Sequence, residues 1–540
     1  MNKATNRLAS IFALLIATIL FTVACGPDVD SEVAPVEEQE ASVIRIGTWS
    51  TGGIENHEDP HRKVGGIGTT ENMYEALAYP YRDTLEIRPL LAEGWDVSDD
   101  GQTYTFTLRE GVQFHDGTTL DAEDVKLSFE RMIAIQEGLG SAELEASIIE
   151  ILTPDENTVV FNLMPGGPPF LALQTGVLIV SSEAVQEHQT DDDPWAIDYI
   201  ATNSVGTGPY RLTEIRAKEI LRMAKFEEYW MGWEDGQVDE IVILEVPEES
   251  TQALMLENGE LDIAPRVPIE SIASLKENPE LQVLEERGTA SFYLRMNTHG
   301  GPLSDVNLRK AFAHAFDYES FTQARADYFP PDGPVPSQFL EEWRPPNLPE
   351  YDIERAKQLY AEAGYGPDNP LRVEQFVVTG NEDQRVAAEI LQQGLRELGV
   401  EYIISPGEFS PIYSGLLRYI REGDESGYID MFTLRMPAIY PDPSAYLAPY
   451  YTGQDLNMMG YSNTEVDALI NMAAPDVAPE WEERVGLYQE AITKIVEDQP
   501  DIWVGVERYQ TVMRATVQGY HMHPLWFPEV LVYPIRLEEE

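Results

Sequence analysis

Residues 89–109 read PLLAEGWDVSDDGQTYTFTLR, and this stretch predicts two strands joined by a tight turn. Asp100-Gly101 is a turn signal, because glycine readily adopts the left-handed backbone conformation that many hairpins require. The residues after it alternate, with Tyr104, Phe106 and Leu108 on one face, which is typical of a half-buried strand. The stretch therefore predicts a hairpin near the start of a folded body.

A helix is expected directly after this hairpin. Asp121 is a typical N-cap residue, and Asp124 follows it in the first turn. Val125, Phe129 and Met132 then recur at helical spacing and form one apolar face. Hairpin and helix together predict a mixed α/β structure.

Strands and helices alternate along the rest of the chain without a fixed period. Strands are expected at 43–49, 158–163, 241–246, 400–404 and 430–434. Helices are expected at 352–363, 390–398 and 480–496, with Asn463 capping another and an apolar stripe at Leu308, Phe312 and Phe316. The fold class is therefore α/β, in at least two lobes.

Composition limits the possible functions. The chain has 540 residues, so we expect about three domains or one large enzyme-like unit. Its content of 43% hydrophobic and 24% charged residues is ordinary for a folded protein. Asp and Glu number 94 against 36 Lys and Arg, a net charge of −58. Such a field repels phosphate backbones, which excludes nucleic-acid binding along the chain. The chain also contains few Lys residues, which suggests a surface adapted to salt, where screening relieves the repulsion between its acidic groups.

The first residues predict export and anchoring. Lys3 and Arg7 precede an apolar run over 8–24, which is typical of a signal peptide at 1–24. The run is shorter than the ~20 residues of a membrane span, and no second one of spanning length follows, so no permease or channel is expected. Thr22-Val23-Ala24-Cys25 resembles the bacterial lipobox, although Leu is usual at the position of Thr22. We expect lipidation of Cys25, the sole cysteine; a plain signal peptide is the alternative. Residues 25–41 are acidic and Pro-containing, and we expect them to be a tether.

Sequence motifs for catalysis, cofactors and metals are missing. No Gly-x-Ser-x-Gly, His-Glu-x-x-His or Walker loop occurs in the sequence. His57 and His61 are spaced as a metal pair could be, but Pro60 lies between them and disrupts a helix. We therefore expect no metal, no cofactor and no enzyme.

Blocks in a fixed order along the chain carry a resemblance to a known family. They are 72–77, 89–101, 104–109, 114–118, 122–125, 206–210, 258–262, 294–297 and 309–312. In this order they resemble the family 5 extracellular solute-binding proteins of ABC importers, over about 44–523. Most of these residues are expected to be scaffold; Gly206 and Gly208, for example, would permit a close backbone approach.

The resemblance implies a two-lobed clamp of the type II periplasmic-binding-protein class, with one extra subdomain. Lobe I would comprise 42–77, 203–295 and 505–540; the inserted subdomain 78–202; and lobe II 296–504. The crossings near 292–298 and 504–509 would form the hinge. A solute bound between the lobes would stabilise closure, and a permease would recognise the closed form.

The loop over 434–443 is expected to contact the solute. Peptide-binding members of the family place an Asp two residues before the Pro of a tyrosine–proline–acid–proline run, where it pairs with the α-ammonium of the peptide. This chain has Ile439 there, so the usual ammonium anchor is missing. Asp442, next to Pro443, is expected to cap a turn.

Other candidates for the ligand site surround this loop. Arg435 would bind a carboxylate, a phosphate or a pair of sugar hydroxyls if it faces the cleft, and would be a surface charge if it does not. Met436 would supply an adaptable wall. Gly66 and Ile67 lie in a Gly-rich run where main-chain groups could meet the ligand; a flexible loop is the alternative. The remaining candidates are Ala438 and the aromatic residues Tyr440, Trp503 and Trp526.

The resemblance thus predicts a monomeric lipoprotein outside the cytoplasm that captures a peptide-like, saccharide or similar organic solute for an ABC permease. A peptide receptor that binds the ammonium through another acid stays open. The alternatives from other classes are a secreted hydrolase and a chaperone-like protein.

Overall fold

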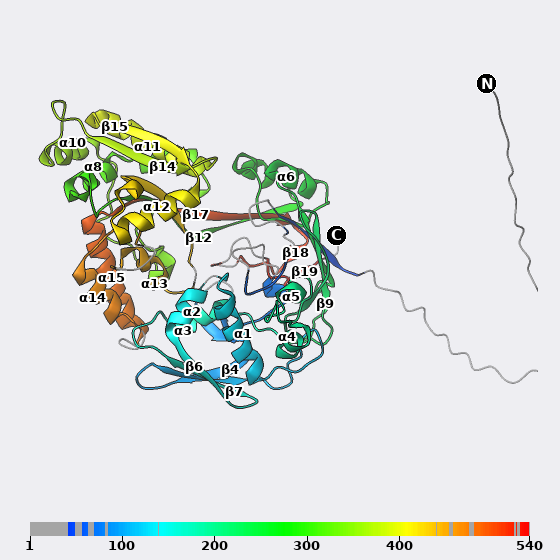
Figure 1. Ribbon diagram of the computed structural model, residues 1–540. Coiled ribbons are helices and arrows are strands. Elements are labelled where there is room, and N and C mark those ends of the chain that lie inside the picture. The colour runs from blue at the N-terminus through cyan, green and yellow to red at the C-terminus, as the bar shows by residue number, and fades with distance from the viewer. Residues whose placement is uncertain are drawn as a thin grey trace, which may run out of the picture. The chain divides into compact units, whose positions relative to one another are not determined.

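A mixed sheet of eleven strands is the largest element of the computed structural model (Figure 1). The strands, in order across this sheet, are β15 (Glu401–Gly407), β14 (Arg372–Val378), β16 (Met431–Met436), β12 (Leu281–Met296), β17 (Asp501–Arg514), β11 (Ile263–Ala264), β1 (Val43–Thr48), β10 (Glu240–Glu245), β9 (Ile220–Lys225) and β8 (Tyr210–Arg216), with β13 (Tyr328–Phe329) on β17. The pairs β1–β10, β1–β11, β14–β15 and β14–β16 are parallel, and the others are antiparallel.

The structure describes residues 41–48, 54, 57–62, 70–80, 85–138, 140–438, 440–452, 457–474, 480–522, 525 and 530–538. The predicted signal peptide and Cys25 lie outside this part of the chain. Within it, no helix is both long enough and apolar enough to cross a membrane.

The two longest strands, β12 and β17, pair with each other and join the two sides of the large sheet. Their ladder is regular from Leu281 to Arg287, is interrupted, and resumes at Ser291 with a shifted register. Gly288 lies in the interruption, where a Cβ atom would sit 2.4 Å from the ring of Tyr509. The close approach of that ring therefore requires glycine at this position.

A separate antiparallel sheet holds the predicted hairpin. Its strands, in order, are β4 (Ala92–Val97), β5 (Thr103–Leu108), β7 (Thr158–Leu163) and β6 (Ile148–Asp155). Gly101 adopts a φ of +69° in the turn between β4 and β5, which confirms the predicted hairpin. Two small sheets pair β2 (Ala78–Pro80) with β3 (Ile87–Pro89) and β18 (Val517–Gln518) with β19 (Arg536–Leu537).

The helix predicted after Asp121 is α1 (Ala122–Ile135), which packs with α2 (Ser141–Ser147) and α3 (Phe170–Leu173) beside the four-stranded sheet (Figure 1). Asp121 and Asp124 form a reciprocal capping box, as their spacing predicts. The backbone approach expected at Gly206 is also confirmed, because a Cβ atom there would lie 2.2 Å from the carbonyl oxygen of Met73.

The other α-helices of the described chain are α4 (Ser182–His188), α5 (Ile197–Ile200), α6 (Glu249–Glu257), α7 (Ile272–Leu275), α8 (Val306–Ala315), α9 (Tyr318–Ala324), α10 (Ile353–Glu362), α11 (Glu382–Leu398), α12 (Phe409–Glu422), α13 (Ser444–Leu447), α14 (Thr464–Met472) and α15 (Trp481–Asp498). Asp352 and Asn463 cap α10 and α14 as predicted. The helix expected at 390–398 starts earlier, because Asn381 caps it by accepting from the backbone of Gln384.

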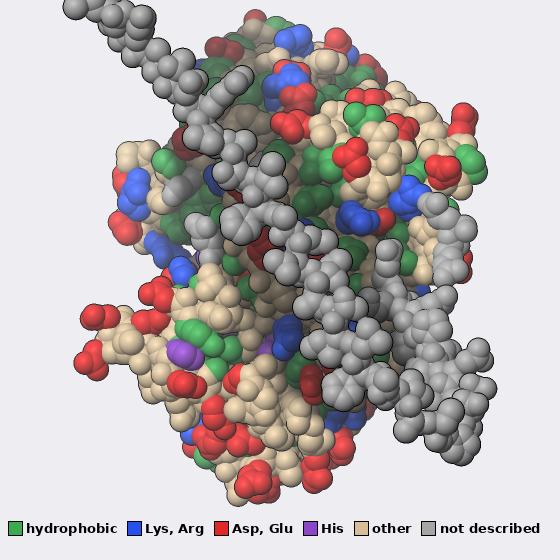
Figure 2. Space-filling view, turned by 90° about the vertical axis from the view of Figure 1, so that its right-hand side faces the viewer, with side chains coloured by type: hydrophobic (Ala, Val, Ile, Leu, Met, Phe, Trp, Pro, Cys, Tyr) green, Lys and Arg blue, Asp and Glu red, His purple; other side chains and the backbone are tan. Residues whose placement is uncertain are grey.

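Acidic side chains are scattered over the face of the molecule that Figure 2 draws, with the fewer basic side chains between them. Hydrophobic and acidic side chains also lie recessed in a hollow near the middle of this face. The excess of acid in the composition is therefore carried at the surface, where water and salt screen it.

Candidate functional site

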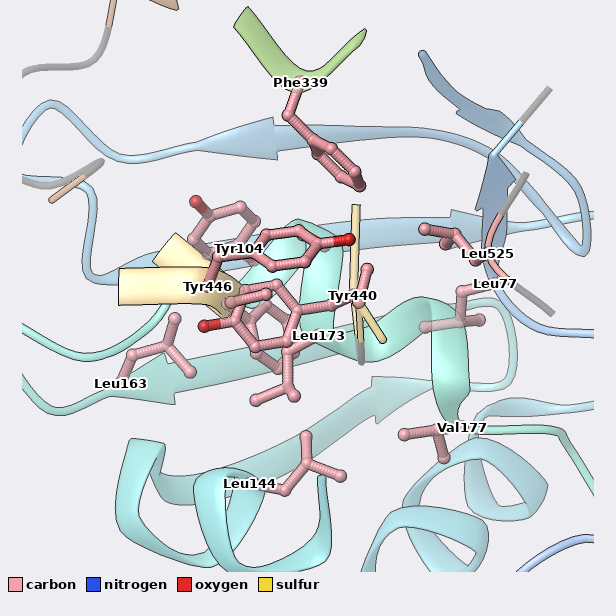
Figure 3. Close-up of a cluster of buried hydrophobic side chains, with 14 of the residues drawn as sticks. Leu77, Tyr104, Leu144, Leu163, Leu173, Val177, Phe339, Tyr440, Tyr446 and Leu525 are labelled. Atoms are coloured by element: carbon pink, nitrogen blue, oxygen red, sulfur yellow. The ribbon is translucent and has the colours of Figure 1, made fainter. Parts of the chain in front are cut away.

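A cluster of buried apolar side chains joins segments that are far apart in the sequence, and we call it the seam cluster (Figure 3). Tyr104 of β5 and Leu173 of α3 come from the predicted subdomain, whereas Phe339, Tyr440 and Tyr446 come from the part predicted to be lobe II. The rings of Phe339 and Tyr446 meet edge to face, with their centroids 5.1 Å apart. The predicted subdomain and predicted lobe II thus share one apolar core.

Three of the predicted site residues lie at the end of β16 or just after it and belong to the seam cluster. Met436, Ala438 and Tyr440 are 6%, 4% and 5% exposed, and all three belong to the cluster. The hydroxyl of Tyr440 accepts a hydrogen bond from Ser444 at 3.3 Å. In this conformation these side chains are packed against other side chains and have little exposure to water.

Arg435 points to the opposite face of the sheet, because successive residues of a strand alternate. Its guanidinium forms a two-point ion pair with Glu507 of β17, with Nη2 2.7 Å from one carboxylate oxygen. Arg435 therefore already has a carboxylate partner, supplied by a residue that was not singled out from the sequence. Among 94 acids, no local signal marks Glu507 as that partner.

Trp503 is 1% exposed and lies within the seam cluster. Its indole nitrogen donates to the hydroxyl of Tyr450 at 3.1 Å, and that hydroxyl donates to Asp501 at 2.5 Å. Asp501 also accepts from Arg295 at 3.0 Å. The indole is thus held by a buried polar network at the start of β17.

Asp442 has the turn-capping role that the sequence predicts. Its carboxylate accepts from the backbone nitrogen of Ser444 at 2.9 Å and from the hydroxyl of Tyr488 at 3.0 Å. Arg484 forms an ion pair with the same carboxylate. These contacts fix the chain just after the candidate loop.

Four other predicted site residues, Gly66, Ile67, Ile439 and Trp526, lie outside the described residues, so their contacts are not part of the geometry given above.

The interruption in β12 brings polar groups to the middle of the β12–β17 pair. Tyr446 donates its hydroxyl to the carbonyl of Thr289, and Gln338 donates to the carbonyl of Gly288 at 3.1 Å. The side-chain hydroxyls of Thr289 and Ser291 are buried and have no hydrogen-bond partner among the described residues. Buried hydroxyls are normally paired, so these two are open to a polar partner.

A groove of about 490 Å³ runs along β12 and β17. Its lining includes Ile269, Ile272 and Arg508 from predicted lobe I, and Thr322 and Tyr328 from predicted lobe II. A smaller cavity of about 180 Å³ adjoins it and contains Glu507, the partner of Arg435. Both cavities are lined by residues of predicted lobe I and predicted lobe II.

His61, considered above as half of a metal pair, has a structural role. It is fully buried, and its Nε2 lies 2.8 Å from the carbonyl oxygen of Leu178. Its Nδ1 lies 3.0 Å from Arg131, which forms a buried ion pair with Asp59. Among the described residues, no group of His, Cys, Asp and Glu is arranged to hold a metal ion.

Comparison with known proteins identifies the family. Residues 86–458 match the model for bacterial extracellular solute-binding proteins, family 5. The chain is 26% identical to heme-binding protein A of Haemophilus influenzae, over 85% of this chain and 86% of that protein. It is 28% identical to di/tripeptide-binding protein 2 of Pseudomonas aeruginosa, over 86% and 90% of the two chains.

Solved structures show the same fold. The structure of HbpA2 from Haemophilus parasuis superposes with a TM-score of 0.80 at 23% identity, over 92% of this chain and all of that one. The predicted α/β fold of the periplasmic-binding-protein type is confirmed, and the hydrolase that the sequence left open has no support. The chain therefore belongs to the family 5 bacterial extracellular solute-binding proteins, and it is a solute-binding protein of ABC transport and not an enzyme.

Proposed function

We propose that this protein is a monomeric lipoprotein that captures a small organic solute outside the cytoplasm and delivers it to an ABC permease. Residues 1–24 would be removed as a signal peptide, and Cys25 would carry the lipid. The acidic tether at 25–41 would hold the binding body away from the membrane. Intact-mass measurement of the protein purified from membranes tests this: it should show a lipid adduct that the Cys25→Ser variant lacks.

The proposed clamp has the boundaries given by the resemblance, with 42–77, 203–295 and 505–540 in lobe I, 78–202 as the subdomain and 296–504 in lobe II. The observation that carries this proposal is the β12–β17 pair, which joins both sides of the large sheet and is interrupted between Arg287 and Ser291. Two connecting strands with a local irregularity suit a hinge, because a few residues can absorb the rotation.

The proposed solute site lies where the end of β16 meets the subdomain. Its residues would be Gly66, Ile67, Arg435, Met436, Ala438, Ile439, Tyr440, Trp503 and Trp526. The hydroxyls of Thr289 and Ser291, for which the described residues offer no hydrogen-bond partner, support a polar contact beside this apolar wall. Arg435 would take part only for an anionic solute that competes with Glu507 for its guanidinium.

The solute is proposed to be peptide-like or another small organic molecule whose recognition does not depend on a free α-ammonium. Proteins similar to this chain are named for binding heme and for binding di- and tripeptides. Ile439 stands where the peptide binders carry the carboxylate for that ammonium. Burying an ammonium without a partner would cost about 3 kcal/mol of binding free energy.

Calorimetry with trialanine and N-acetyl-trialanine tests whether the affinity for a peptide depends on its free α-ammonium. The wild type should bind the two forms with affinities within about threefold, because removing the ammonium loses no ion pair. Preference of the wild type for the free amine by about a hundredfold would show that another acid binds the ammonium. That result would establish the open alternative, a peptide receptor with a different anchor.

Ile439→Asp supplies the matched gain-of-function variant. It should raise the preference for the free amine by about tenfold or more, whereas Ile439→Asn, of similar size but neutral, should not. Equal behaviour of the Asp and Asn variants would remove Ile439 from the proposed site.

A further inference from the structure

Another pocket, of about 460 Å³, lies among residues of 71–90, 109, 209–231 and 521–534, and we call it the Glu75 pocket. No lining residue comes from 296–504, so this pocket is not part of a gap between the two proposed lobes. Its wall contains Tyr74, Tyr229, Trp230 and Tyr533, and the aliphatic side chains of Leu90 and Leu531 add to it. A concave site with aromatic walls and few polar groups is typical of small-molecule binding.

A buried carboxylate holds the aromatic wall in place. Glu75 is 5% exposed and accepts hydrogen bonds from the hydroxyl of Tyr229 at 2.8 Å and the indole nitrogen of Trp230 at 2.9 Å. Thr207 donates to it at 2.8 Å. Since the polar edges of both rings are fixed from below, the rings keep their positions whether or not a ligand fills the space above them.

Arg109 supplies a positive group to this pocket. Its Nε donates to the carbonyl of Leu90 at 2.6 Å, and its guanidinium carbon lies 5.0 Å from the ring of Trp230. In the described part of the chain, no carboxylate forms an ion pair with Arg109. Its terminal nitrogens are thus held in orientation by two contacts and are open to an anion.

Arg88 and His521 add further basic groups to the lining, in a protein whose net charge is −58. Arg88 is paired with Glu86 at 2.7 Å, so Arg109 is the main candidate for contact with an anion. Glu71 is the other acid of the lining, and it accepts from Thr70 at 3.0 Å.

We propose that the Glu75 pocket is a second ligand site, which binds a small planar organic anion of the aromatic carboxylate class. The ring lies against Trp230 and the tyrosine wall, where flat apolar surface is available. The carboxylate accepts two hydrogen bonds from the guanidinium of Arg109, the geometry that a planar carboxylate and a planar guanidinium favour. This site is separate from the solute site proposed above.

Titration calorimetry of the mature protein tests this site with three probe pairs: benzoate, indole-3-acetate and quinoline-2-carboxylate, each compared with its neutral amide. At least one acid should bind saturably and about tenfold or more tightly than its amide, because only the anion pairs with Arg109. Binding of no acid at millimolar concentration, or equal binding of each acid and its amide, would overturn the proposal.

Variants locate the binding. Arg109→Gln should lower the affinity for the acid by about tenfold or more. Arg109→Lys keeps the charge but not the two-point geometry, so its affinity should lie between those of the wild type and Arg109→Gln. Leu531→Trp, which places a larger side chain in the wall of the pocket and leaves the Arg109 residue itself unchanged, should also abolish binding. Unchanged affinity in both Arg109→Gln and Leu531→Trp would overturn the proposal.

Arg435→Gln is the matched control, because Arg435 lies outside the Glu75 pocket. It should leave the affinity for the acid unchanged, and a loss there would mean that the probe binds at the proposed solute site. Titration with N-acetyl-trialanine separates the two sites further, since Arg109→Gln should not affect that peptide. A far-ultraviolet spectrum and melting curve for each variant verify that it is folded.

Discussion

The seam cluster and the Glu75 pocket are both built from aromatic side chains, but the first is packed and the second is hollow. In the seam cluster, Phe339 and Tyr446 contact each other and the apolar side chains around them. In the Glu75 pocket, Tyr229 and Trp230 are fixed at their edges by a buried carboxylate.

The two regions differ in whether the interactions that hold their side chains are directional. Apolar contacts are non-directional, so a surface such as the seam cluster can separate and pack again when two lobes move. Hydrogen bonds to Glu75 have defined lengths and angles, so the walls of the pocket stay in place. Under the two proposals, the solute site would move with the lobes, whereas the second site would be preformed.

Phe339→Ala is expected to have the largest effect on stability, because it removes a ring from the seam cluster. Phe339 is 2% exposed, and a buried Phe→Ala change costs about 3–5 kcal/mol through lost contacts and a cavity. Urea unfolding followed by circular dichroism measures this loss.

Phe409→Ala is the matched control for this change. Phe409 is 45% exposed, so the same chemical change there should cost much less, of order ~0.5–1 kcal/mol. Equal losses in the two variants would mean that the seam cluster contributes no more than surface packing.

Glu75→Gln tests the rigid pocket through the pH dependence of stability. Burial raises the pKa of Glu75 to about 7, even though Trp230, Thr207 and Tyr229 donate hydrogen bonds to it. The unfolded carboxyl ionises near 4.5 and the folded one near 7, so the folded state holds more protons between these values. Wild-type stability relative to Glu75→Gln should therefore fall by up to about 3 kcal/mol from pH 4.5 to 7 and be constant above.

Only the difference between wild type and variant isolates Glu75. Burial also raises the pKa of Asp124 to about 7, which adds a fall over the same range. Burial lowers the pKa values of His61 and His115 to about 4, so their contribution to stability rises between pH 4 and 6.5. A difference curve that is flat from pH 4 to 8 would mean that the Glu75 carboxyl ionises as it does in water.

Tyr446→Phe is expected to have the smallest effect of the three. It removes one buried hydrogen bond, to the carbonyl of Thr289, and should cost about 1 kcal/mol while the ring stays packed. Tyr351→Phe, at a residue that is 48% exposed, should cost close to nothing. A Tyr446→Phe loss as large as that of Phe339→Ala would show that the bond to the β12 interruption, and not ring packing, holds the seam together.

Local patterns predict the elements of this fold well, because the interactions that start and end them are close in sequence. Asp121 with Asp124, and Asn463, cap helices from within three residues. The Asp100-Gly101 turn lies inside the hairpin that it forms. The start of α11 was missed, because Asn381 caps it ahead of the apolar residues that mark its end.

The candidate site was harder to predict, because its contacts join distant residues. Arg435 and Glu507 are 72 positions apart, and Glu75 meets Trp230 across 155 positions. The alternation of a strand separates Arg435 from Met436, but only the partner strands determine which face belongs to which cavity. The sequence predicts Trp503 as a ligand contact, yet its indole donates to Tyr450 within a buried network.

Closure around a solute is the central claim, and a distance measurement between spin labels tests it most directly. Labels at Leu254 on α6 and Met472 on α14, 56% and 49% exposed, report on proposed lobes I and II in a Cys25→Ser background. Gently purified protein that retains its solute would be compared with protein unfolded, dialysed and refolded, before and after the solute is returned. We expect a broad distance distribution without solute and a distinct, narrow one with it. An unchanged distribution, with saturable solute binding verified by calorimetry, would contradict the clamp.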